Sequence, residues 1–345
     1  MTLVAIMTGL LFSISCGSQA VKFPDQNLEA VIREAINKPE GSILRSDFKS
    51  ITSLEAERKE IANLSGLEYC TNLEKLNLTA NQISDISQLS KLTKLENIEL
   101  FVNQISNVAP LSGLNNLRIL QISNNLISDI SPLTSLSNLE VLNIQENKII
   151  DISPLKKMQG IKALAIDSNP IVDFSPLSFL TEMTDLGLTG VNANDISVLA
   201  SLHNLENLHL GGNQISDISP LSELKALREL ELGVNQIESL SPLVSLTNLQ
   251  SLELSSNRIT DIQPLQSMSN LISLYLGGNN IIDISALDNL TNLQSLRLDG
   301  NSIKDISALL NLPNLKMLTI LEGNPLNEQS LRVVEQLKSR GVEVR

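Results

Sequence analysis

Residues 73–92 read LEKLNLTANQISDISQLSKL, and this stretch decides the fold because its pattern returns every 22 residues. Seven apolar positions recur in nearly every copy, together with one asparagine. A period held this strictly, without insertions between copies, predicts one supersecondary unit repeated many times. Ten asparagines, which we call the asparagine ladder, keep the spacing: Asn81, Asn103, Asn125, Asn147, Asn169, Asn213, Asn235, Asn257, Asn279 and Asn301.

Each copy, or coil, predicts a strand followed by a short helical turn. The residues around Leu76 and Leu78 alternate between apolar and polar, which is the period of a strand. Asn81 ends that strand. Its amide both donates and accepts hydrogen bonds, so we expect it to satisfy backbone groups in the water-free bend inside the coil. The second half reads Asp-Ile-Ser-Pro-Leu in many copies, and there Ser131 and Pro132 are predicted to be the cap and the first residue of a helical or 3₁₀ turn.

A single coil buries too little apolar surface to offset the ordering of its backbone, so the coils must stack and both ends need covers. Near the start, residues 23–36 have helical periodicity, and a second short helix is expected around 46–49. Near the end, Glu328–Ser339 reads as an amphipathic helix that Gly341 ends, and 342–344 reads as a closing strand. The sequence therefore predicts a helical cap at each end.

Composition excludes several classes of protein. The chain has 345 residues, 42% hydrophobic and 2% aromatic, so we expect an ordered protein with an aliphatic core. Its net charge is −13. A chain this acidic does not follow phosphate backbones and is poorly suited to bind an anionic membrane surface directly. Nucleic acid is therefore not expected as a partner.

The two cysteines are predicted to have separate roles. Cys16 and Cys70 are not spaced as metal ligands or as a CxxC redox pair. Cys70 lies eleven residues before Asn81, where later coils hold leucine or methionine, so we expect a small buried apolar residue there. A disulfide between the two is not expected, because Cys16 belongs to a different kind of segment.

The amino terminus resembles the leader of a bacterial lipoprotein. Residues 1–15 carry no charged side chain, and their apolar stretch is too short to span a bilayer but suits the core of a signal peptide. Residues 15–18 read Ser-Cys-Gly-Ser, which resembles a lipobox, although Ser13 stands where leucine is usual. The resemblance implies export and a lipid on Cys16. The alternative is a disordered apolar leader.

The repeats resemble the 22-residue leucine-rich repeats of bacterial internalins. The stretches that carry the resemblance are LEYCTNL at residues 67–73 and NQISDI at 81–86, and the likeness extends over 23–345. It implies an α/β solenoid, a right-handed curved superhelix with a parallel concave β-sheet and short 3₁₀, helical or extended segments on the convex side. Phosphatase-regulating repeat proteins of eukaryotes have the same period but are intracellular and lack such a leader.

These features predict the organisation of the whole chain. We expect a signal peptide at 1–15, a tether at 16–22, a helical cap with an irregular first coil at 23–60, repeats at 61–323 and a closing cap at 324–345.

The concave sheet is the expected binding surface. Strand residues at odd offsets before each asparagine are expected to point outward onto it. An exposed apolar patch often marks an interaction site, and tyrosine and arginine are favoured at interface hot spots. Scattered surface hydrophobes and a solvated acidic face are the alternatives. The apolar half of this surface holds Phe101, Val102, Ile119, Val141, Ala163 and Ala165, and the mixed half holds His209, Glu229, Glu231, Glu253, Tyr275 and Arg297.

Catalysis finds little support in the sequence. His203 is expected on the convex surface, and His209 has no serine or cysteine nucleophile at a motif spacing. Glu231 and Glu253 imitate an acid/base pair, but a regular array of coils places such pairs by default. We therefore predict no catalytic residue, metal or cofactor. A column of aspartates is expected to cap the turns and not to bind calcium: Asp85, Asp129, Asp151, Asp173, Asp195, Asp217, Asp261, Asp283 and Asp305.

One coil breaks the pattern. Val191 replaces the asparagine, Ala193 replaces an isoleucine and Val198 replaces the proline. The lost amide is expected to leave backbone groups without partners, and the alanine removes core volume. The sequence therefore predicts a local weak point and a slight change of curvature.

The sequence as a whole favours a non-enzymatic protein-binding module of the bacterial cell envelope, monomeric, lipid-anchored through Cys16 or secreted. The first alternative is an intracellular regulator that docks on an enzyme such as a phosphatase. The second, less favoured, is a hydrolase.

Overall fold

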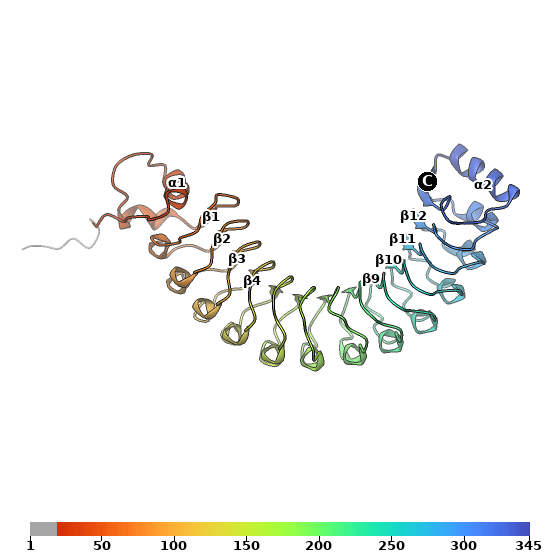
Figure 1. Cartoon of the computed structure of the whole chain (residues 1–345), viewed down its shortest axis with the longest axis horizontal. Helices are drawn as coiled ribbons and strands as arrows, with labels where there is room; N and C mark the ends of the chain where they lie inside the picture. Colours follow the sequence, from red (N-terminus) through yellow and green to blue (C-terminus); the bar gives the residue numbers. More distant parts are fainter. Residues whose placement is uncertain (1–18) are drawn as a thin grey trace, which may run out of the picture.

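The computed structural model describes residues 19–345, which form one curved solenoid. A 14-stranded parallel sheet, with its strands in sequence order, lines the inner side of the arc, and short 3₁₀ helices follow the outer side (Figure 1). An α-helix lies at each end, α1 (Gln26–Ala35) near the start and α2 (Glu328–Ser339) near the close. The predicted leucine-rich repeat solenoid is confirmed.

The strands are β1 (Ser53–Glu55), β2 (Lys75–Asn77), β3 (Asn97–Glu99), β4 (Ile119–Gln121), β5 (Val141–Asn143), β6 (Ala163–Ala165), β7 (Asp185–Gly187), β8 (Asn207–His209), β9 (Glu229–Glu231), β10 (Ser251–Glu253), β11 (Ser273–Tyr275), β12 (Ser295–Arg297), β13 (Met317–Thr319) and β14 (Glu343–Val344). The 3₁₀ helices are η1 (Arg45–Ser50), η2 (Leu67–Tyr69), η3 (Ser87–Lys91), η4 (Ala109–Leu111), η5 (Ser131–Ser135), η6 (Ser153–Lys157), η7 (Ser175–Phe179), η8 (Ser197–Ser201), η9 (Ser219–Leu221), η10 (Ser241–Leu243), η11 (Gln263–Leu265), η12 (Ser285–Asn289) and η13 (Ser307–Asn311).

The register of the sheet decides which residues face outward. From β1 to β13, paired residues are 22 apart, as in the pair of Ser53 with Lys75. Ile98 and Leu100, five and three residues before Asn103, are buried. The expectation that odd offsets point outward is therefore wrong. Because side chains alternate along a strand, the residues six, four and two before each ladder asparagine form the concave surface. We call these the outward positions.

Each ladder asparagine joins two coils. The Oδ1 atom of Asn103 accepts a hydrogen bond from the backbone N–H of Ile83 at 3.0 Å. Its Nδ2 atom donates to the carbonyl oxygens of Leu78 at 3.0 Å and Leu100 at 3.2 Å. The expected role inside the coil is confirmed, and the bonds also reach the preceding coil. The same three contacts recur at Asn81, Asn125, Asn147, Asn169, Asn213, Asn235, Asn257, Asn279 and Asn301.

The aspartate column caps the outer turns, as predicted. The Oδ1 atom of Asp129 accepts a hydrogen bond from the backbone N–H of Ser131 at 2.8 Å, and this bond lowers the pKa of the carboxyl. Ser131 was expected to be the cap itself. It is instead the first residue of η5, and the aspartate two residues earlier supplies the oxygen. All nine aspartates of the column make this contact.

The two caps cover the ends of the core. In α1, Asp25 accepts hydrogen bonds from the first turn, and Leu28 and Ile32 are buried. At the other end α2 has the predicted bounds, and β14 pairs with β13. Cys70 is buried as expected, and burial raises the pKa of its thiol to about 12. No helix among residues 19–345 has the length and apolar character needed to span a membrane.

The coil around Val191 keeps a partner for one backbone N–H but lacks other hydrogen bonds between coils. No asparagine stands at 191 to accept the backbone N–H of Ile171. This N–H donates instead to the backbone carbonyl of Asn169 at 2.9 Å, so the expectation that it is left without a partner is wrong. A second series of backbone hydrogen bonds joins neighbouring coils, such as that from Gln214 N to Ala193 O. This series is interrupted at the Val191 coil. Residue 170 is a proline without an N–H, and within the described part of the chain residue 192 makes no such bond.

We expect the double variant Val191→Asn, Ala193→Ile to melt at a higher temperature than the wild type. The asparagine restores contacts between coils worth about 0.5–1.5 kcal/mol each, and the isoleucine returns the apolar volume of the other coils. A gain of 1 kcal/mol corresponds to roughly 1–2 °C in a chain of 345 residues, because the entropy of unfolding is about 2 cal/mol/K per residue. Calorimetry of the double and both single variants measures the effect, and an unchanged or lower Tm contradicts it.

Candidate binding face

The predicted apolar half of the face has five of its six residues at outward positions. Ile119, Val141, Ala163 and Ala165 lie on β4 to β6 and are half-exposed, and Phe101 follows β3 and is also half-exposed. Val102 does not belong with them. It lies in the bend after β3 with a left-handed backbone (φ 53°), and its side chain is 49% exposed. We therefore remove Val102 from the face, because the bend takes it out of the strand's alternation.

The predicted mixed half forms one continuous row across five strands. His209, Glu231, Glu253, Tyr275 and Arg297 are the third residues of β8 to β12, and the register pairs each with the next. Within the row, the Nδ1 atom of His209 lies 2.8 Å from Oε2 of Glu231. The structure thus brings together the residues that the sequence assigned to this half.

Arg297 is held at its place in the row by its own coil. Its Nε atom donates to Oδ1 of Asp299 at 2.7 Å, and this bond raises the pKa of the guanidinium. Its side chain remains exposed. The pair therefore presents both a cation and an anion to a partner, and not a free positive charge.

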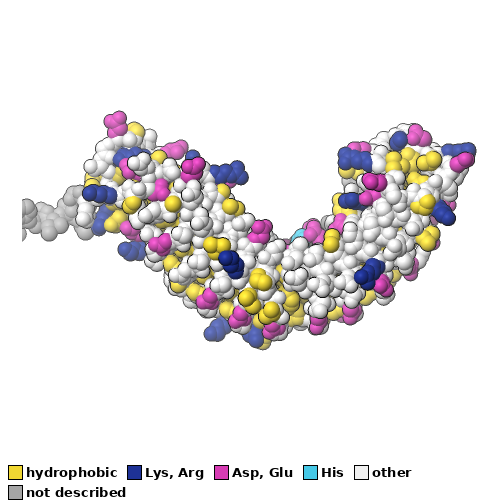
Figure 2. All heavy atoms as spheres, in the orientation of Figure 1, with side chains coloured by type: hydrophobic (Ala, Val, Ile, Leu, Met, Phe, Trp, Pro, Cys, Tyr) yellow, Lys and Arg dark blue, Asp and Glu magenta, His cyan; other side chains and the backbone are white. Residues whose placement is uncertain are grey.

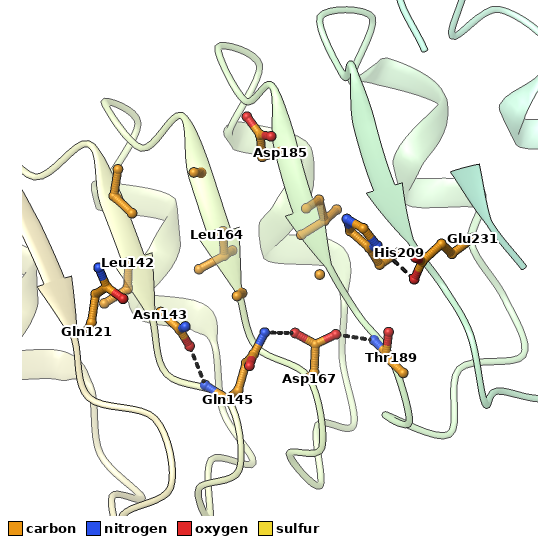
Figure 3. A pocket seen from close by; sticks show the side chains of 15 residues that line it. Gln121, Leu142, Asn143, Gln145, Leu164, Asp167, Asp185, Thr189, His209 and Glu231 are labelled. Carbon is orange, nitrogen blue, oxygen red and sulfur yellow. Dashed lines mark hydrogen bonds and ion pairs between the residues drawn. The ribbon is translucent and has the colours of Figure 1, made fainter. Parts of the chain in front are cut away.

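A hollow of about 410 Å³, which we call the central hollow, opens in the face between β5 and β8 (Figure 3). Small outward residues leave the space: Ala163 and Ala165 on β6 and Gly187 on β7. Asp167 and Asp185 lie at its border, and the pair of His209 with Glu231 closes one side. Figure 2 shows Asp and Glu side chains gathered with a histidine at this middle part of the inner side.

Gly187 has no room for a side chain because the Asp167 carboxylate lies close to it, and not because of its backbone conformation. Its φ is not positive, yet a Cβ at this residue would lie 2.5 Å from Oδ2 of Asp167. That carboxylate accepts hydrogen bonds from Nε2 of Gln145 and from the backbone N–H of Thr189, each at 2.6 Å. It therefore links three successive coils above the glycine.

Asp185 is held in a similar way on the other side of the hollow. It accepts hydrogen bonds from Nδ2 of Asn207 at 2.6 Å and from the hydroxyl of Thr184 at 2.5 Å. Among the described residues, neither Asp167 nor Asp185 forms an ion pair. The sequence analysis missed both, although each occupies an outward position and Gly187 lies two residues after Asp185 on β7.

Three side chains beside the hollow have the geometry of a possible metal site, where none was predicted. One ligand atom each from His209, Glu229 and Glu231 lies within 4.8 Å of the others. All three are half-exposed, and exposed acidic groups commonly meet without an ion. We assign no metal. Among the described residues no serine or cysteine hydrogen-bonds to His209, so the arrangement offers no activated nucleophile of that kind.

The family model for leucine-rich repeats (two copies) matches the chain at residues 71–113, 93–135, 115–157, 203–245 and 247–289. The chain therefore belongs to the leucine-rich repeat family. Among solved structures, an internalin from Listeria monocytogenes is similar to it, with 36% identity and a TM-score of 0.73. The match covers 93% of this chain and 88% of the internalin.

Two more distant structures share the fold. A leucine-rich repeat protein from Leptospira interrogans has 22% identity and a TM-score of 0.75, covering 86% of this chain and 84% of that one. The ectodomain of a membrane receptor kinase from Arabidopsis thaliana has 21% identity and a TM-score of 0.65, covering 87% of this chain and 38% of that one. No curated protein sequence matches the chain.

We expect Gly187→Ala to destabilise the protein by roughly 1–3 kcal/mol, because the new methyl group displaces the Asp167 carboxylate from its bonds to Gln145 and Thr189. Gly113→Ala is the matched control, since a Cβ there meets nothing within 4 Å. Urea unfolding of both variants measures the difference. Equal stability of the two variants would show that the approach of Asp167 is not a constraint.

Proposed function

We propose that this protein binds another protein through its concave face and acts by shape and hot-spot complementarity, without catalysis. The observation that carries the proposal is the unbroken sheet, which aligns the outward residues of successive coils in rows. At about 4.8 Å between strands the face is roughly 60 Å long, which is ample for a specific interface. Its apolar and mixed halves meet at the central hollow.

The family relationship supports this proposal. Leucine-rich repeats are typically scaffolds for protein interaction, and the likeness to an internalin extends over most of both chains. The Arabidopsis receptor ectodomain was solved in complex with CASPARIAN STRIP INTEGRITY FACTOR 2, and a second plant receptor, for a peptide hormone, was solved with its ligand RGF2. These two are similar in fold alone, so they support a binding role and not a particular partner.

We further propose that the protein is exported to the bacterial cell envelope and carries a lipid at Cys16. The support is the apolar leader followed by the Ser-Cys-Gly-Ser segment, which lies outside the described residues. An intracellular regulator of an enzyme such as a phosphatase is the alternative. Cell fractionation separates the two, because only the exported protein is recovered with the envelope.

Labelling of cells with a lipid precursor tests the anchor. We expect the wild type and Cys70→Ala to be labelled, because Cys70 is buried in the core, and Cys16→Ala to lose the label. Equal labelling of the wild type and Cys16→Ala contradicts the lipid anchor and leaves the binding proposal standing.

Binding of the partner tests the concave face. Once a partner has been captured by cross-linking to the full chain, we expect Phe101→Ala and Tyr275→Ala each to weaken its affinity about tenfold, the effect of losing a hot-spot contact worth roughly 1.4 kcal/mol. Calorimetric titration measures the change.

The matched control is Phe179→Ala. Phe179 ends η7 on the outer side of the arc and is 47% exposed, so it tests loss of an exposed aromatic side chain away from the sheet. Affinity that falls for Phe179→Ala and stays unchanged for the two concave variants places the interface on the convex side and rejects the proposal.

A further inference from the structure

We infer that the central hollow is a subsite for an arginine side chain presented by the protein partner. This rests on the proposed function and names the chemistry that the face selects at its middle. The inference stands on the charge of the border, the way its carboxylates are held, and the nature of the floor.

The border of the hollow carries negative charge that the protein does not neutralise. Asp167 and Asp185 form no ion pair among the described residues, and the partner of Glu231 is His209, which is charged only when protonated. Lys162, which adjoins β6, pairs instead with Glu140 at 3.2 Å. The border therefore offers a cation carboxylates on three of its sides, and the lining contains no lysine or arginine.

Neutral donors fix two of these carboxylates in position. Asp167 is held by the Gln145 amide and by the backbone N–H of Thr189, and Asp185 by Asn207 and Thr184. Such bonds orient a carboxylate without cancelling its charge, and each oxygen keeps a second lone pair for another donor. Because the acceptors are already ordered, a ligand loses less free energy in ordering them.

The floor suits the stem of a long cationic side chain. The methyl groups of Ala163 and Ala165 cover the hollow's base, with Leu164 and Leu186 beneath. Arginine and lysine place their methylene stems along apolar surface and keep the charged head among polar groups. The guanidinium has five donors in a planar fork that matches the two oxygens of a carboxylate, and this favours arginine over lysine.

Other occupants fit less well. An apolar side chain that fills the hollow removes water from the carboxylates without giving them donors, which costs free energy. An anionic side chain meets the repulsion of the border. A divalent metal ion fits better beside the hollow, where His209, Glu229 and Glu231 converge, than over the alanine floor.

The test uses Nα-acetyl-arginine amide as the probe and the full chain with labelled alanine methyl groups. Ala163 and Ala165 report from the floor by NMR, and Ala226 reports from a distant coil. We expect saturable shifts of the two floor methyls up to about 50 mM probe, since two charge-assisted hydrogen bonds support millimolar affinity. The neutral isostere Nα-acetyl-citrulline amide is expected to leave them unmoved, and Nα-acetyl-lysine amide to bind more weakly than the arginine probe.

A pair of matched variants assigns the effect to the border. Asp185→Asn keeps an acceptor for Asn207 and removes the charge, so we expect Kd to rise about tenfold. Asp129→Asn makes the same change on the outer side, where Asn107 already serves as a cap, and is expected to leave Kd unchanged. An unmoved Ala226 signal verifies the fold of each variant.

Three results overturn the inference: no saturable shift with the arginine probe, equal shifts with the citrulline probe, or no effect of Asp185→Asn. Equal affinity for lysine overturns the preference for arginine. Each of these leaves the concave interface intact if Phe101→Ala and Tyr275→Ala still weaken partner binding. Conversely, unchanged partner affinity in those two variants rejects the interface, whatever the probe does.

Discussion

The structure depends on one side-chain amide, that of the ladder asparagine, which bonds to its own strand and to the backbone of the preceding coil. Asn103 ties Leu100 of its own coil to Leu78 and Ile83 of the coil before. Because these hydrogen bonds repeat, each coil takes the same position relative to the preceding coil. Neighbouring strands therefore pair with a constant shift of 22 residues. The outward positions then fall into rows, and rows of side chains form a binding face.

Between Asn81 and Asn301 one coil lacks this asparagine, and it contributes a principal part of the candidate site. Its strand is β7, whose Asp185 and Gly187 line the central hollow. The Asp167 carboxylate reaches across to Thr189 of that coil at 2.6 Å, so a side chain of the neighbouring coil provides one link where the amide does not. The irregular coil thus lacks one series of backbone bonds between coils and also contributes two residues to the lining of the central hollow.

The sequence predicted what every coil repeats. The asparagine contacts, the aspartate caps and buried Cys70 follow from the 22-residue period, and the bounds of α2 follow from its amphipathic pattern and from Gly341. The sequence analysis expected odd offsets before each asparagine to point outward, whereas the even offsets do. Val102 was assigned to the face because a left-handed bend is not visible in the pattern. The hollow was missed because it depends on contacts between coils, such as that of Gln145 with Asp167, at residues that vary from coil to coil.

The most direct test of a concave binding face is hydroxyl-radical footprinting of the protein with and without its partner. Phe101 and Tyr275 on the inner side and Phe179 on the outer side are oxidisable reporters that the chain already contains. The account predicts that the partner protects Phe101 and Tyr275 from oxidation and leaves Phe179 as reactive as in the free protein. Protection of Phe179, with Phe101 and Tyr275 unchanged, would contradict it.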